Sequence, residues 1–236
     1  VESVDDLRTS NPAVNEKLLA GLAGHLVQAR YDLKSLMRQI LISHTYRRSS
    51  EPLEENRDDR RYYSRYYPRR LPAEVLSDAI ADITGVSDVY TEILLNDGST
   101  EKTAYAPETR ALQLPDSAVK SYFLKTFGRN AREITCECER SNQPGLVQVL
   151  HLSNGSTLND KLSAKEGHIT RLMASDPAPA RIIEEAWVLC TGHPPADDQR
   201  RKFGELFQSL PPEEKRTAVE DLYWSLLTSP EFLFQH

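Results

Sequence analysis

Residues 213–228, EEKRTAVEDLYWSLLT, place apolar side chains at the three- and four-residue spacing of an amphipathic helix. Prolines at 211 and 212 precede this run and Pro230 follows it, so both ends of the helix are marked. Such a helix must bury its apolar stripe against other elements, which favours a helical array. The predicted face is made of Ala218, Val219, Leu222, Tyr223, Leu226 and Leu227.

The same rhythm recurs along the chain and predicts further helices. In the C-terminal half they are expected at 145–153, 157–163, 166–174, 178–190 and 196–209. Near the N-terminus, Asn11-Pro12 is expected to cap a first helix, and a second follows from about Asp32. Two such helices joined by a few residues usually pack as an antiparallel pair. A third helix, 71–85 (LPAEVLSDAIADITG), is expected to bury Val75, Leu76, Ala79, Ile80 and Ile83 and to end at Gly85.

The section between these helical regions is less regular. Glu92–Leu95 and Ala111–Leu114 are interpreted as brief strands, and Asp116–Phe127 as a short helix. Residues 134–139 alternate in polarity, as in a half-buried extended segment. The predicted fold is therefore mainly α: a single-domain, multi-helix array over residues 1–236, with a small irregular or β-containing insertion around residues 86–140.

Composition limits the classes of partner. The net charge of −6 argues against a nucleic-acid or anionic-membrane binder. No apolar run approaches the roughly 20 residues needed to cross a bilayer, so we expect no membrane insertion. The first residues resemble neither a start nor a signal segment, and we expect the chain to be part of a longer protein.

Three cysteines form one candidate site. Cys136 and Cys138 flank a single residue, so in an extended segment both thiols point to the same side, and Cys190 is the third. A structural disulfide from Cys190 to either of them, free buried thiols and a metal or redox site all stay open. Because zinc sites usually combine Cys-x₂₋₄-Cys spacing with four ligands, we predict no metal.

Arginine and tyrosine dominate residues 47–70, RRSSEPLEENRDDRRYYSRYYPRR. One interpretation is a binding surface in which tyrosine rings stack on bases or sugars and arginines hold anions. The favoured one is an internal clamp, in which arginines pair with carboxylates of the helix at 71–85. The candidate residues for the clamp or the surface are Arg65, Arg69, Arg70, Glu74, Asp78 and Arg140, and Arg69 and Arg70 are the expected partners of the stripe Glu74, Asp78 and Asp82.

Carboxylates spaced along one helix face also satisfy the distance that glycoside hydrolysis requires. Most such stripes are only solvated, and the sequence shows no cleft beside this one. His-Glu-x-x-His, Gly-x-Ser-x-Gly and glycine-rich phosphate motifs do not occur. We therefore name no catalytic residue.

Six phrases in this order carry a family resemblance: NPAVNEKLL, DLKSLMRQILISHTYRRSS, RRLPAEVLSDAI, FLKTFGRNAREITCECERS, LVQVLHLSNG and LYWSLLTSPEFLFQH. Together they resemble the planctomycete-specific C-terminal domain of unknown function, over nearly the whole chain. The resemblance implies an exported bacterial parent with a cytochrome c-like domain and a second planctomycete-specific domain. The chain lacks Cys-x-x-Cys-His, so we expect no cofactor within it, and any haem would belong to the upstream parent.

Two functions remain in view. The first is a non-catalytic interaction or structural module that docks to sibling domains of the same polypeptide, a cell-surface protein or a glycan. The alternative is an enzyme or redox-accessory domain, acting on polysaccharide or with an upstream haem domain. An enzyme requires a concave pocket with converging polar groups, whereas a docking module requires an exposed apolar patch.

Overall fold

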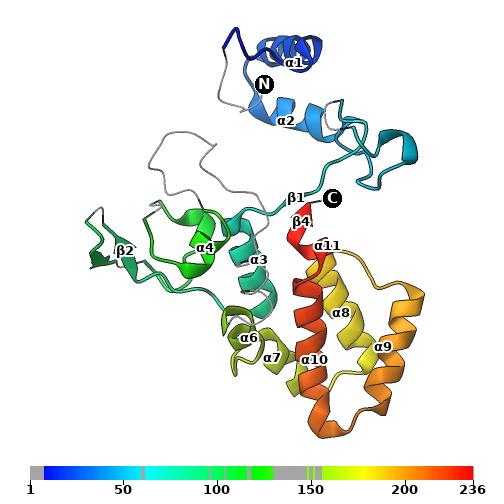
Figure 1. Ribbon diagram of the computed structural model, residues 1–236. Helices are drawn as coiled ribbons and strands as arrows, with labels where there is room; N and C mark the ends of the chain where they lie inside the picture. Colours follow the sequence, from blue (N-terminus) through cyan, green and yellow to red (C-terminus); the bar gives the residue numbers. More distant parts are fainter. Residues whose placement is uncertain are drawn as a thin grey trace. The chain divides into compact units, whose positions relative to one another are not determined.

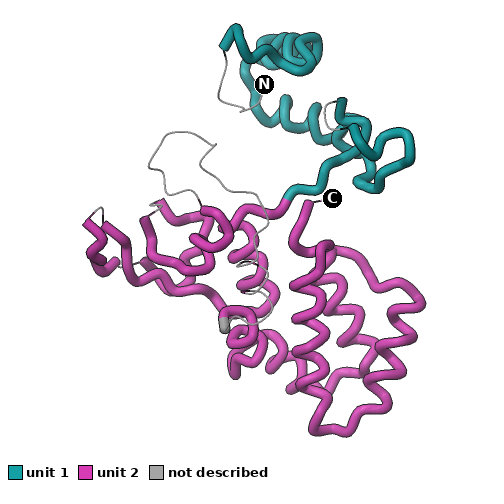
Figure 2. Tube along the Cα trace, in the orientation of Figure 1, with its two compact units in different colours: residues 1–69, 134–139, 236 teal, residues 70–133, 140–235 magenta. Residues whose placement is uncertain are grey.

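The computed structural model describes residues 8–59, 62–95, 97–103, 105–115, 118–129, 148, 151 and 156–235. The chain divides into two compact units (Figure 2). Unit 1 comprises residues 1–69, 134–139 and 236, and unit 2 comprises residues 70–133 and 140–235. The single-domain organisation over residues 1–236 stays a prediction.

Unit 1 contains helices α1 (Glu16–Gln28) and α2 (Leu33–Leu41), followed by a 3₁₀ turn, η1 (Glu54–Asn56). The prediction that Asn11 caps the first helix is wrong, because the side chain of Asn15 accepts from the amide of Leu18 at 3.0 Å and fixes the start four residues later. Asp32 caps α2 as expected, accepting from two amides of its first turn. The helices contact each other, but neither contains a buried residue.

Unit 2 begins with α3 (Ala73–Thr84), which ends at Gly85 with a left-handed φ of 67°. That conformation favours glycine and explains why the helix stops there. Leu76, Ile80 and Ile83 are buried as predicted. Two other predicted core positions, Val75 and Ala79, are only half-buried, because α3 turns its carboxylate side inward as well.

The predicted insertion contains a small hairpin, β2 (Glu92–Leu94) with β3 (Thr100–Lys102), antiparallel with Ile93 opposite Glu101. The strand predicted at Ala111–Leu114 is wrong: Ala111–Gln113 form a 3₁₀ turn, η2, whose first amides are held by a side chain of α3. The helix predicted at Asp116–Phe127 is shorter, α4 (Tyr122–Thr126), because Ser121 caps it. Residues 134–139 lie outside the described residues.

The C-terminal half is a set of packed helices (Figure 1). Helix α8 packs against both α9 and α10, and the rings of Trp187 and Phe203 meet edge-on, 5.2 Å apart, between α8 and α9. Strand β1 (Arg69–Arg70) pairs with strand β4 (Phe234–Gln235) in a short two-stranded sheet. The elements are α6 (Ser156–Leu162), α7 (His168–Ala174), α8 (Pro179–Thr191), α9 (Asp197–Ser209), α10 (Pro212–Leu227) and α11 (Pro230–Leu233).

These bounds follow the predicted helices closely, and the fold is mainly α with two small two-stranded sheets among the described residues. The helix predicted at 145–153 falls almost entirely outside the described residues. The core of unit 2 joins α3, α4 and the C-terminal helices, and its most deeply buried large side chains include Leu76, Phe127, Ile183, Phe207, Tyr223 and Leu227.

Candidate functional site

Two of the three carboxylates on α3 face the interior of unit 2. Glu74 is 7% exposed and Asp78 is 5% exposed, one helical turn apart, whereas the side chain of Asp82 is 61% exposed. Buried carboxylates need hydrogen-bond donors to compensate for lost hydration. The partners of these groups therefore decide what the stripe can do.

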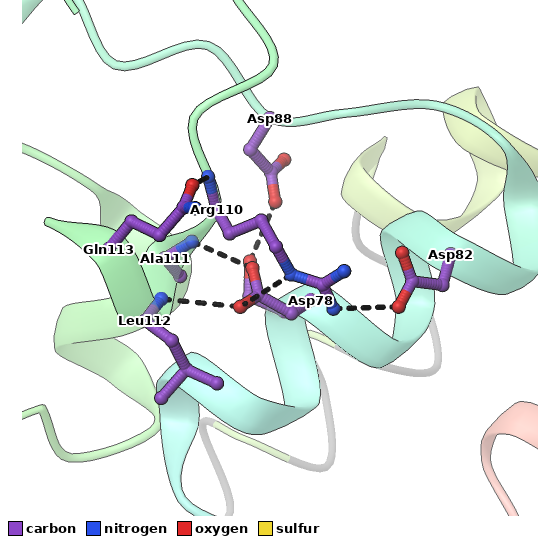
Figure 3. A network of polar contacts seen from close by, with 8 residues as sticks. Asp78, Asp82, Asp88, Arg110, Ala111, Leu112 and Gln113 are labelled. Atoms are coloured by element: carbon purple, nitrogen blue, oxygen red, sulfur yellow. Dashed lines mark hydrogen bonds and ion pairs between the residues drawn. The ribbon is translucent and has the colours of Figure 1, made fainter.

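Asp78 holds the start of η2 from across the fold (Figure 3). Its carboxylate accepts from the backbone amides of Ala111 at 2.7 Å and Leu112 at 3.2 Å. Arg110 reaches the same carboxylate through Nε at 3.5 Å and reaches Asp82 through Nη2 at 2.7 Å. An acceptor at the start of a helical turn satisfies amides that have no partner within the turn. This arrangement ties the insertion to α3.

A second set of polar contacts starts at Ser77, one residue before Asp78. The hydroxyl of Ser77 donates to Asp88 Oδ2 at 2.7 Å, and Lys161 Nζ lies 3.0 Å from Asp88 Oδ1 (Figure 3 shows Asp88). The same ammonium donates to the carbonyl of Val86 at 2.6 Å. Burial raises the pKa of nearby Tyr90 to about 12, so its phenol stays protonated. Lys161 thereby joins α6 to the segment after α3.

Arginines occupy the other end of α3. Arg129 Nε lies 3.6 Å from Glu74 Oε1, and both side chains are about nine-tenths buried. Arg70 donates from Nη2 to the carbonyl of Phe127 at 2.9 Å and lies over that ring, 5.5 Å from its centroid. Burial lowers the pKa of Arg70, although arginine keeps its charge over the ordinary pH range. These contacts connect α3 to the C-terminal side of α4.

The clamp interpretation expected Arg69 and Arg70 to pair with the carboxylates of α3. In the structure, Arg110 contacts Asp78 and Asp82. Arg129 pairs with Glu74. Arg110 and Arg129 lie far along the chain from α3, and no local spacing marks them. They were missed because only the folded chain brings them to the helix.

In the arginine- and tyrosine-rich segment of unit 1, side chains form hydrogen bonds with the backbone of the same segment. Arg65 reaches the carbonyls of Ser50 at 3.3 Å and Arg57 at 3.5 Å, and its guanidinium lies over the ring of Tyr67, 5.0 Å from the centroid. Asp59 accepts from two amides of the same segment and from the hydroxyl of Ser64. These contacts hold the segment together through its own backbone, whereas the predicted clamp paired arginines with the carboxylates of α3, so that clamp stays a prediction for this segment. Arg69, at the end of the segment, is exposed.

Among the cysteines, Cys190 is a free thiol buried on α8. Burial raises its pKa to about 12, which keeps the sulfur protonated and weakly nucleophilic. Of the arrangements left open for it, the structure shows a buried thiol. Cys136, Cys138 and Arg140 lie outside the described residues, so their roles stay predictions.

Helices α1 and α2 leave part of their apolar surface open to solvent, although Leu22, Leu26 and Leu36 are half-buried. Leu18 and Leu19 on α1 are 55% and 52% exposed. On α2, the side chain of Met37 is 59% exposed. Single exposed apolar side chains are normal in folded proteins, but a group of them on neighbouring helices indicates an interaction surface. We define the docking surface as Leu18, Leu19, Val27, Leu33, Met37, Ile40 and Leu41.

In the part of the chain that the structure describes, no three or more His, Cys, Asp or Glu side chains are placed to hold a metal ion. No helix there combines the length and apolar character needed to cross a bilayer.

The fold and the exposed surface define the chain as a mainly helical protein whose buried polar groups brace its core. It belongs to the family described as "Protein of unknown function (DUF1553)", PSD1, which it matches over residues 1–207. No curated protein and no solved structure matches the chain.

Proposed function

We propose that the chain is a non-catalytic interaction module that docks against a sibling domain of the same polypeptide through α1 and α2. The observation that carries the proposal is the docking surface: two amphipathic helices that bury no residue and leave seven large apolar side chains exposed. Burying such side chains contributes roughly 1.5–3 kcal/mol each when complete, which is a strong drive for association.

Charge on the same helices indicates what kind of partner surface would fit. Lys17, Lys34 and Arg38 lie on α1 and α2 beside the apolar side chains. A partner with an apolar centre and an acidic rim would complement this arrangement. A folded sibling domain meets that description better than a hydrated polysaccharide does.

The family resemblance supports a finer version of the proposal. The parent would be an exported planctomycete protein with a cytochrome c-like domain, and any haem would lie in that domain. The present chain would then bring a sibling domain into a fixed position without a cofactor of its own.

In the test, the sibling domain that the proposal requires is expressed as a separate protein. Its binding to the present chain is measured by biolayer interferometry. Wild type is expected to bind, and the double variant Leu19→Glu/Met37→Glu is expected to bind at least about 100-fold more weakly, because two charges would be placed in an apolar contact.

The matched control is Leu189→Glu on α8, where the leucine is 43% exposed. It changes another exposed apolar residue, outside the docking surface, and should leave binding unchanged. Failure of wild type to bind, or equal binding by the double variant, would contradict the proposal. Thermal denaturation of each variant establishes that the fold is retained.

A further inference from the structure

A hollow of about 400 Å³ opens between α6 and α10 in unit 2. Its apolar lining comes from Leu162 and Trp224. Its polar lining comes from Asn159 on α6, from Ser163 directly after α6, and from Glu220 and Asp221 on α10. One aromatic ring thus shares a concave surface with an amide, a hydroxyl and two carboxylates.

Trp224 differs from the other tryptophan of the chain. Trp187 is 4% exposed and packs against Phe203 in the core. Trp224 is half-buried, packs on the core with part of its ring and lines the hollow with another part. A half-buried indole in the wall of a hollow offers both an apolar ring face and an N–H donor to a ligand.

The two carboxylates of the hollow are electrostatically different. Glu220 pairs with Arg216 at 2.8 Å, and the same guanidinium donates to Thr170 Oγ1 at 3.0 Å, which fixes the wall of the hollow. Asp221 is exposed, and the described part of the chain supplies it with no hydrogen-bond or ion-pair partner. The hollow therefore carries one compensated and one uncompensated carboxylate.

We infer that this hollow binds a single pyranose residue of a neutral glycan, a site separate from the docking surface and independent of the proposed function. The C–H face of the sugar ring would lie on Trp224, and its hydroxyls would donate to Asp221 and exchange hydrogen bonds with the Asn159 amide. The Ser163 hydroxyl, which donates to the carbonyl of Asn159 at 2.9 Å, would accept from the sugar. Asp221 would repel an acidic sugar. A cationic ligand fits less well, because one ring forms no aromatic cage and Arg216 already compensates Glu220.

The size of the hollow and its exposure to solvent determine how tightly a sugar is expected to bind. Its volume lies at the lower end of the range for small-molecule sites, and the sugar would remain partly in water. We expect a dissociation constant on the order of 1 mM for one residue.

The two tryptophans make the test internally controlled. In ¹⁵N-labelled full chain, each indole N–H has its own NMR resonance, and Trp224→Phe identifies which one belongs to residue 224. The probes are cellotetraose, xylotetraose and mannotetraose, with tetragalacturonate as the acidic probe and N-acetylarginine amide as the cationic one. We expect at least one neutral probe to shift the Trp224 resonance saturably and to leave that of Trp187 in place.

Variants then locate the binding. Asp221→Ala should weaken the neutral probe about tenfold, since a hydrogen bond to a charged group is lost. The control Asp198→Ala, another exposed acid of a helix in unit 2, should not change binding. Absence of a shift with all three neutral probes, a response to the arginine probe alone, or equal binding by Asp221→Ala would overturn the inference.

Discussion

Both units of the molecule contain amphipathic helices, yet they use their apolar faces differently. In unit 2, Leu76 on α3 and Ile183 on α8 are completely buried. In unit 1, Leu19 on α1 and Met37 on α2 are more than half exposed, although their spacing in the sequence is equally regular. The difference teaches that a helical apolar stripe predicts a contact surface, and that the contact can be made with another molecule as well as with the core.

The largest expected effect is on the free energy of unfolding, and it should differ between unit 2 and unit 1 for the same substitution. Leu76→Ala removes a fully buried side chain and should lower the free energy of unfolding by about 2–5 kcal/mol. Leu19→Ala, the same change on α1, should alter it by less than about 0.5 kcal/mol. Urea denaturation followed by circular dichroism measures both values. A comparable loss in Leu19→Ala would show that α1 is covered in the folded chain.

The second effect tests whether the buried carboxylate acts as a brace. Asp78→Ala leaves the buried amide of Ala111 and the partly buried amide of Leu112 without their acceptor, while Arg110 keeps Asp82, and should cost about 2–4 kcal/mol. Asp82→Ala removes only the exposed end of the same network and should cost about 0–1 kcal/mol. Thermal denaturation of the two variants side by side provides the measurement. Equal losses would mean that Asp78 contributes no more than a surface ion pair.

The smallest effect concerns pH and is again confined to unit 2. Burial lowers the pKa of His168, which lies 3.1 Å from Glu185 and 3.2 Å from the hydroxyl of Tyr223, while Glu185 acts in the opposite direction. The unfolded chain therefore takes up this proton first as pH falls below the usual histidine pKa of about 6.5. Stability should be complete above that pH and decrease towards the lower folded pKa.

The comparison for this prediction is His168→Gln, which keeps a side-chain hydrogen-bonding group near Tyr223. The variant should lose less stability than wild type between pH 7 and pH 5. Unfolding free energies from urea titrations at the two pH values provide the measurement. An identical slope in both proteins would show that His168 does not contribute to the acid response.

Much of the fold followed from local patterns. The bounds of α8, α9 and α10 were predictable because apolar periodicity, prolines and glycines act within a few residues. The misplaced start of α1 and the wrongly predicted strand at Ala111–Leu114 have a different origin. In both places a side chain binds amides: Asn15 next to its own helix, and Asp78 from another element.

The candidate sites were less predictable. The carboxylate stripe on α3 was visible in the sequence, but its partners Arg110 and Arg129 were not. The place of Trp224 in a polar hollow depends on the approach of α6, which no local pattern around the tryptophan shows. Partners that meet across large separations leave no spacing that a sequence pattern can show.

The sequence by itself determined that this chain is mainly helical, where most of its C-terminal helices begin and end, and that it carries an arginine- and tyrosine-rich segment between helices. Those features depend on periodicity and capping, which neighbouring residues decide. Only the tertiary structure decided which apolar stripes are buried, which arginine meets which carboxylate, and where a tryptophan lines a hollow. These properties depend on desolvation and on contacts between distant segments, which exist only once the helices have packed.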